Sequence, residues 1–135
     1  MLVRRFPRAI GSLPLLVAFV REFFAQRRWD PDQAYDLDLV LEELFTNMVR
    51  HARGGTSEIE VGLTADDGSL TVRLRDEGVG PWDPSQAPAA DVSRPLEERR
   101  PGGLGLHFIR QITRDLRFEH VDGTAIVTAV LKAPR

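Results

Sequence analysis

Apolar residues recur at helical spacing in two stretches in the first half of the chain. The first stretch repeats them every three or four positions: Leu13, Leu16, Val17, Val20 and Phe24. This spacing predicts a helix over about residues 12–28, with Ser12 as its N-cap. A second helix is predicted over about residues 31–53, because Asp30-Pro31 is a typical helix start and Gly54-Gly55 is a typical stop.

The period of the apolar positions changes from helical to alternating after residue 55. Two alternating runs flank the turn sequence Asp66-Asp67-Gly68 and predict a β-hairpin: Ile59, Val61 and Leu63, then Leu70, Val72 and Leu74. A short first strand is expected within residues 1–10. Helical spacing returns to about residue 116, through Leu104, Phe108, Ile109, Ile112 and Leu116. Two further strands are expected near residues 116–121 and 124–132.

This order of elements predicts the class of fold. Helices come first and are followed by a hairpin, a loop, a helix and a second hairpin, which favours an α+β fold with an antiparallel or mixed sheet and helices on one face. The loop, residues 77–103, contains five prolines and has little periodicity. Loops of this length tend to be disordered linkers or functional lids. A chain of 135 residues has room for one domain, residues 1–135.

Composition narrows the possible partners. The 20 acidic and 18 basic residues nearly cancel, and a formal net charge of -2 gives no general attraction to nucleic acid or to a membrane surface. The absence of cysteine excludes disulfides and cysteine-ligated metal. The longest apolar run, residues 13–20, is interrupted by Pro14 and is too short to span a bilayer. We therefore expect a cytoplasmic protein that binds neither nucleic acid nor a membrane.

Three polar side chains interrupt the apolar face of the second predicted helix. Glu43, Asn47 and His51 follow one another at intervals of four residues, so a helix with about 3.6 residues per turn places them on one side. Burying an acid and an amide costs free energy unless another group pairs with them, and a bound metal ion is one candidate. For His51, contact with the last helix carbonyls is an equally good interpretation.

A buried acid is also expected at the end of the hairpin. Counting by two from Leu70 puts Asp76 on the inward face of its strand, so this carboxylate needs a hydrogen-bond donor. Gly78 and Gly80 follow directly and would let the backbone approach a ligand closely. A solvated turn at the end of an ordinary strand explains the same residues.

Two more glycine-containing segments lie near the C-terminus. Gly103-Leu104-Gly105-Leu106 leads into the third predicted helix, where free N–H groups could bind phosphate, although a flexible hinge fits the segment equally well. Neither the dinucleotide-binding fingerprint nor the P-loop matches it. Asp122-Gly123-Thr124 reads most simply as a hairpin turn. No role is assigned to His107 or His120.

The residue types favour magnesium and phosphate chemistry over other reactions. The chain has no cysteine and no serine in an elbow motif, so the sequence gives little support for nucleophilic catalysis. Glu43 and His51 lack the paired-histidine spacing of a helical zinc site. Mg²⁺ accepts a single protein oxygen, keeps several waters and takes its remaining ligands from phosphates, so Asn47 could provide that oxygen.

Taken in order, these segments resemble the motifs of a known superfamily. They are Glu43-x-x-x-Asn47-x-x-x-His51, Asp76-x-Gly78-x-Gly80, Gly103-Leu104-Gly105-Leu106 and Gly123-Thr124. Together they are similar to the asparagine box, the two glycine boxes and the terminal Gly-Thr of the GHKL ATPases, which include gyrase, histidine kinases and heat-shock chaperones. The resemblance covers about residues 10–132. Within that superfamily the chain looks like a stand-alone anti-sigma-factor serine/threonine kinase of a bacterial partner-switching system.

The resemblance implies a fold and a set of residue roles. The fold would be the Bergerat-type two-layer α/β sandwich, with a mixed, mostly antiparallel sheet and an ATP lid at about residues 81–102. Glu43 would be the general base, Asn47 the Mg²⁺ ligand, and Asp76 the acceptor for the adenine amino group, supported by Thr124. The other positions implied to bind the nucleotide are His51, Gly78, Gly80, Arg100, Gly103, Leu104, Gly105 and Leu106. Glu42 is a rival base, but it lies about 100° away from the Asn47 face.

The leading functional hypothesis is therefore an ATP- and Mg²⁺-dependent protein-serine/threonine kinase that acts as an anti-sigma factor. Its expected partners are an anti-sigma-factor antagonist, which it would phosphorylate, a sigma factor, and a second copy of itself in a homodimer. Two alternatives stay open. One is a regulatory module that binds nucleotide without phosphotransfer, and the other is the detached catalytic domain of a histidine kinase.

Overall fold

The computed structural model describes residues 1–27, 31–51, 54–66, 68–81 and 103–132. In chain order its elements are β1 (Leu2–Pro7), a 3-10 turn (Ile10–Ser12), α1 (Leu13–Ala25), α2 (Pro31–His51), β2 (Glu58–Asp66), β3 (Ser69–Glu77), α3 (Gly103–Ile112), β4 (Thr113–Val121) and β5 (Thr124–Leu131). Most of the expected lid, residues 82–102, lies outside the described residues, as do residues 52–53 at the predicted end of the second helix.

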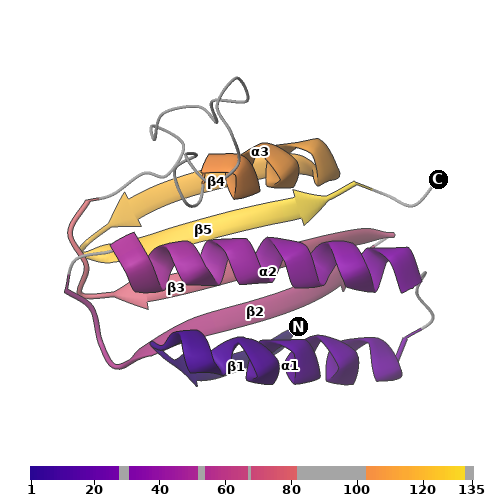
Figure 1. Ribbon diagram of the computed structural model, residues 1–135, viewed down its shortest axis with the longest axis horizontal. Helices are drawn as coiled ribbons and strands as arrows, with labels where there is room; N and C mark the ends of the chain where they lie inside the picture. Colours follow the sequence, from indigo (N-terminus) through magenta and orange to yellow (C-terminus); the bar gives the residue numbers. More distant parts are fainter. Residues whose placement is uncertain (28–30, 52–53, 67, 82–102, 133–135) are drawn as a thin grey trace.

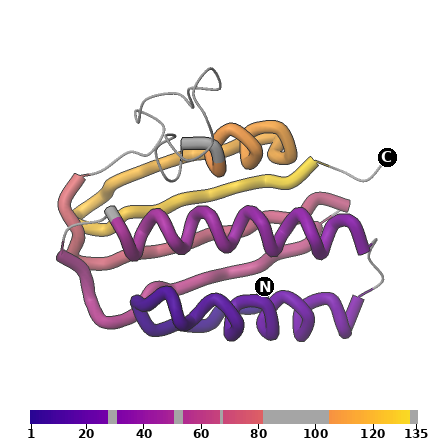
Figure 2. Tube along the Cα trace, in the orientation of Figure 1, coloured from indigo at the N-terminus to yellow at the C-terminus, as the bar shows by residue number. Residues whose placement is uncertain are grey.

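The strands form one sheet of five in the order β1-β2-β3-β5-β4. All four pairings are antiparallel. The helices lie together on one face of the sheet, with α2 between α1 and α3 (Figure 1). The same two layers can be followed along the backbone trace (Figure 2). The α+β prediction is confirmed, and the sheet is more regular than expected because none of its pairings is parallel.

Alternation along the strands builds the interface between the two layers. In β3 the buried positions are 70, 72, 74 and 76, while their neighbours face the side of the sheet without helices. The predicted apolar stripe of α2 meets this face, with Leu37, Val40, Leu41 and Leu44 all buried. The period of two in the strands and the helical period in α2 therefore produce a single core.

The predicted third helix ends four residues early. It stops at Ile112, and β4 begins at once with Thr113, whose hydroxyl donates a 2.8 Å hydrogen bond to the carbonyl of Ile109. Leu116 reaches the core from β4, opposite Ala129. Its position coincided with the helical period, so the sequence alone could not separate helix from strand. Phe108, another residue of that period, is exposed.

The start of α1 also differs from the prediction. Ser12 is buried, and its hydroxyl makes no capping hydrogen bond to the helix. It donates instead to the carbonyl of Pro7 at a distance of 2.7 Å. Ser12 therefore ties the end of β1 to the start of the helix, and α1 ends at Ala25, short of residue 28. Among the described helices, none combines the length and the apolar character needed to cross a membrane.

Phe19 tests how much the core depends on the packing between α1 and β1. Its ring is fully buried and meets Phe6 edge-on, with ring centroids 5.3 Å apart. Phe19→Ala should lower the free energy of unfolding by about 3–5 kcal/mol in urea denaturation, because it leaves a cavity. Phe108→Ala is the matched control at an exposed site and should change it by less than about 0.5 kcal/mol. Equal losses in the two variants would contradict the packing described here.

Candidate functional site

Asp76 ends the inward row of β3 and is completely buried. One carboxylate oxygen, Oδ1, accepts a hydrogen bond from Nη2 of Arg8 in an ion pair. The other oxygen, Oδ2, is also buried and has no hydrogen-bond partner within the described part of the chain. The expected inward acid is therefore present, and one of its two oxygens is left without a donor.

Arg8 is the donor that the sequence did not identify. It follows β1, and its guanidinium group is held at three places. Nε donates to the Thr56 carbonyl at 2.9 Å, Nη1 donates to the Met48 carbonyl at 3.4 Å, and Nη2 donates to Asp76. Gly55 packs so tightly against this group that a Cβ there would collide with it. Arg8 therefore joins the end of β1, α2, the segment before β2, and β3 at one point.

The first glycine segment is tied to its neighbours through Val79. The Val79 N–H donates to the Gly123 carbonyl at 3.0 Å, and the Val79 carbonyl lies 2.8 Å from Nε2 of His120. Gly78 has a φ of 74°, a conformation that favours glycine, whereas Gly80 does not have a positive φ. His120, to which the sequence assigned no role, thus helps to hold the backbone that follows Asp76.

The α2 face carries Glu43 and Asn47 as predicted. Asn47 is buried, and Glu43 is half-buried with its Oε1 atom unpartnered among the described residues. Burial raises the pKa of the Glu43 carboxyl, a hydrogen bond with the Asn47 side chain lowers it, and the nearby Glu42 charge raises it again, so the net change is upward. A carboxylate only accepts hydrogen bonds, so the Asn47 side chain donates through Nδ2 in this contact.

The second glycine segment lies directly against Glu43. Gly105, in the first turn of α3, packs so closely that a Cβ on it would overlap the Glu43 carboxylate. Leu106, the next residue, is buried in the core. The first N–H groups of a helix are unsatisfied within that helix, so the start of α3 presents donors beside an acid and an amide.

The strand register does not support the expected role of Thr124. Asp76 lies opposite Ala125 on β5, whereas Thr124 lies opposite Glu77. Because side chains alternate along a strand, Thr124 points to the face of the sheet without helices and away from Asp76. The Gly-Thr resemblance is one residue out of phase with the pairing in the sheet, and a methyl group stands where a hydroxyl was expected.

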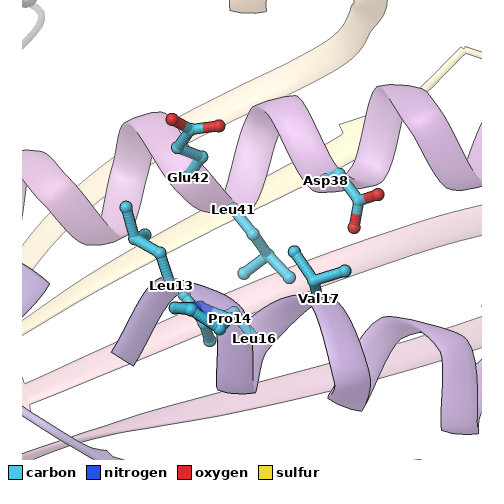
Figure 3. A pocket seen from close by; sticks show the side chains of 7 residues that line it. All are labelled: Leu13, Pro14, Leu16, Val17, Asp38, Leu41 and Glu42. Atoms are coloured by element: carbon cyan, nitrogen blue, oxygen red, sulfur yellow. The ribbon is translucent and has the colours of Figure 1, made fainter. Parts of the chain in front are cut away.

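A cavity of about 270 Å³ lies in a different place, between α1 and α2. Seven residues line it (Figure 3): Leu13, Pro14, Leu16, Val17, Asp38, Leu41 and Glu42. Its wall is mostly apolar and includes none of Asn47, Asp76 and Gly105. Glu42 thus borders this cavity, whereas Glu43 contacts α3. The two candidate bases therefore face different parts of the molecule.

The remaining predicted site residues are placed only in part. His51 ends α2, and Gly103 and Leu104 begin α3, but the side chains of His51 and Leu104 are not described. Arg100 lies outside the described residues. The structure brings Glu43, Asn47 and Gly105 together at one end of the site and places Asp76 near Met48 at the other, through Arg8. Residues 43 and 48 are about 7.5 Å apart along a helix axis.

Comparison with known proteins gives the family. Residues 6–131 match the family model of the histidine kinase-like ATPase domain, and the chain belongs to this family. Serine/threonine-protein kinase BtrW of Bordetella bronchiseptica is 30% identical over 98 residues, covering 71% of this chain and 68% of that protein. Serine-protein kinase RsbW of Bacillus cereus is 28% identical over 101 residues, covering 71% of this chain and 62% of that protein. The predicted resemblance is thus confirmed.

Solved structures agree on the fold. The RsbU and RsbW domains of a Mycobacterium tuberculosis protein align with the whole of this chain at a TM-score of 0.64 and 18% identity, and this chain covers 33% of theirs. The histidine kinase AdeS of Acinetobacter baumannii also aligns with the whole chain, at a TM-score of 0.53 and 16% identity, over 69% of its own length. At these identities the two structures support the fold alone.

Gly105 tests the close contact between α3 and Glu43. Gly105→Ala should lower the free energy of unfolding by about 1–3 kcal/mol, because the new methyl group overlaps the carboxylate and forces α3 or Glu43 to move. Gly11→Ala is the control, since a Cβ there meets nothing within 4 Å and its φ is not positive. Urea denaturation measures both variants. A Gly105→Ala protein as stable as the control variant would mean that α3 does not sit on Glu43.

Proposed function

We propose that residues 1–135 form one ATP-dependent protein-serine/threonine kinase domain that phosphorylates a protein partner. The observation that carries this proposal is the half-buried Glu43 beside Asn47, facing the start of α3. A carboxylate whose pKa is raised by burial is a stronger base than an ordinary one, and phosphoryl transfer from ATP to a hydroxyl needs a base next to the phosphates. The kinase names of the BtrW and RsbW relatives support the same reaction.

The described residues fit ATP and Mg²⁺ at both ends of the site. At the adenine end of the site, the unpartnered Oδ2 of Asp76 suits the 6-amino group of adenine, which is a hydrogen-bond donor. At the phosphate end, the N–H groups at the start of α3 suit oxyanions, and the amide oxygen of Asn47 suits a hard cation. Bound Mg²⁺ would neutralise phosphate charge as the transfer proceeds.

The chain's own residues divide the remaining work. Glu43 takes the proton from the partner's serine or threonine hydroxyl as that oxygen attacks the γ-phosphorus and the bond to ADP breaks. Asn47 donates to Glu43 and keeps the carboxylate in place on the α2 face. Gly105 lets α3 lie close enough to Glu43 for the phosphates and the base to share one end of the site.

The biological setting belongs to the same proposal. This chain spans 68% of the BtrW relative and 62% of the RsbW relative, so the activities of those whole proteins are transferred here as a hypothesis. We propose a cytoplasmic anti-sigma factor that phosphorylates an anti-sigma-factor antagonist, binds a sigma factor and forms a homodimer. A regulatory module without phosphotransfer would bind ATP and leave the antagonist unmodified, and a histidine kinase domain would produce phosphohistidine.

Glu43→Ala tests the base. With Mg-ATP and the antagonist protein, this variant should transfer phosphate about 10²–10⁴-fold more slowly than the wild type, because the proton acceptor is gone. Glu42→Ala is the matched control, one residue away and exposed, and should keep at least half of the wild-type rate. Phosphoserine formation, followed by mass spectrometry, measures both. Similar losses in the two variants would remove Glu43 from the role of base.

The raised pKa of Glu43 predicts the pH dependence. Transfer needs the ionised carboxylate, so kcat/KM should fall with decreasing pH at a midpoint above the ordinary glutamate value of about 4.3. Because Arg50 lowers this pKa, Arg50→Gln should move the midpoint further up.

The same shift affects stability. Because folding raises the pKa of Glu43, the protonated side chain is tolerated in the folded state at low pH, and the free energy of unfolding falls as pH rises through the folded-state pKa and the buried carboxyl ionises. Glu43→Gln should therefore melt at a higher temperature than the wild type at pH 7.

A midpoint at or below the ordinary glutamate value would contradict this prediction. So would a Glu43→Gln protein that melts at a lower temperature than the wild type at pH 7. Either result would show that the protein does not disfavour the ionised carboxylate, and the buried base would lose its physical support.

A further inference from the structure

The contact between Arg8 and Asp76 assigns a further residue to the site. We infer that Arg8 is a positioning residue for nucleobase recognition: it permanently occupies Oδ1 of Asp76, so that Oδ2 is the only carboxylate oxygen left to accept the amino group of adenine. This inference rests on the proposed function, since it takes Asp76 as the residue that meets the base. It adds the group that decides how Asp76 does so.

The anchoring of Arg8 indicates that it stays in place when a nucleotide binds. Its side chain is only 15% exposed, and all three guanidinium nitrogens donate to protein oxygens. Met48 lies in the last turn of α2, whose carbonyls form the negative end of the helix dipole and favour a cation. Displacing Arg8 would leave a guanidinium without its anchors and a buried carboxylate without its counterion, which is strongly unfavourable.

Oδ2 has no donor from the protein within the described residues. The residue across the sheet from Asp76 is Ala125, whose methyl group can neither donate nor accept a hydrogen bond. The neighbouring Gly78 offers no side chain either. A buried carboxylate oxygen without a donor is costly, and a ligand that brings an N–H group to it removes that cost.

The pairing also predicts which base is accepted. A carboxylate oxygen that Arg8 holds in place attracts an exocyclic amino group and repels a carbonyl oxygen, so adenine should be favoured over hypoxanthine, which carries oxygen at the same position. Without Arg8 the carboxylate loses its counterion and the hydrogen bond to Oδ1. Asp76 could then rotate away from the position in which Oδ2 accepts the amino group, and the discrimination between the two bases would fall.

The experiment compares ATP with inosine triphosphate, which carries a carbonyl oxygen in place of the 6-amino group and a hydrogen on N1, in isothermal titrations at constant Mg²⁺. The wild type should prefer ATP by about tenfold or more. Arg8→Met should weaken ATP binding by about tenfold and bring the ratio of the two affinities close to one. Arg4→Met is the matched control on β1, because Arg4 pairs with Glu22 at a distance of 2.7 Å outside the site, and it should keep the wild-type ratio.

Arg8→Lys keeps the charge but not the planar fork, so it should retain a preference for ATP that is severalfold weaker than in the wild type. If Arg8→Met does not fold, the ratio in Arg8→Lys decides the matter. An unchanged ratio in folded Arg8 variants would overturn the inference, as would tighter ATP binding, which would mean that Arg8 blocks the site. A wild type that binds neither nucleotide would instead refute the proposed function.

Discussion

The burial of the Asp76 carboxylate is the constraint on which the site depends. A charged group with no exposure to water needs a counterion, and Arg8 provides it from the end of β1. The same guanidinium also donates to carbonyls of α2 and of the segment before β2, so one side chain fixes the relative positions of four parts of the fold. The adenine end of the site is therefore held together by an ion pair and its hydrogen bonds, on a scaffold that the apolar core holds in place.

The phosphate end follows a different principle, which is close packing around an acid. Glu43 interrupts an otherwise apolar helix face, and burial between α2 and α3 raises the pKa of its carboxyl. Gly105 makes this burial possible, because no other residue leaves room for the carboxylate at that point of α3. Asn47 donates to the acid from the next turn of the same helix. The buried carboxylate of Glu43, which is unfavourable for folding, therefore lies where the proposed reaction takes place.

Much of the fold could be predicted from the sequence because its periods are strong. The α2 stripe and the alternation in β2 and β3 identified the core and the inward position of Asp76. The errors arose where two elements share a period or meet at a distance in sequence. Leu116 fitted a helix but belongs to β4, and Thr124 matched a motif but lies one residue out of register with Asp76. Arg8 was missed because no local pattern shows which of 18 basic residues reaches a carboxylate 68 positions away.

A single nucleotide lying along α2 from Asp76 to Glu43 would unite the two ends of the proposed site. The most direct measurement is a crystal structure of the protein with Mg²⁺ and a non-hydrolysable ATP analogue. We expect the adenine amino group at Oδ2 of Asp76, with Arg8 still on Oδ1, the metal at the Asn47 amide oxygen, and the γ-phosphate between Glu43 and the start of α3. A nucleotide bound in the apolar cavity between α1 and α2, or a base that makes no contact with Asp76, would contradict it.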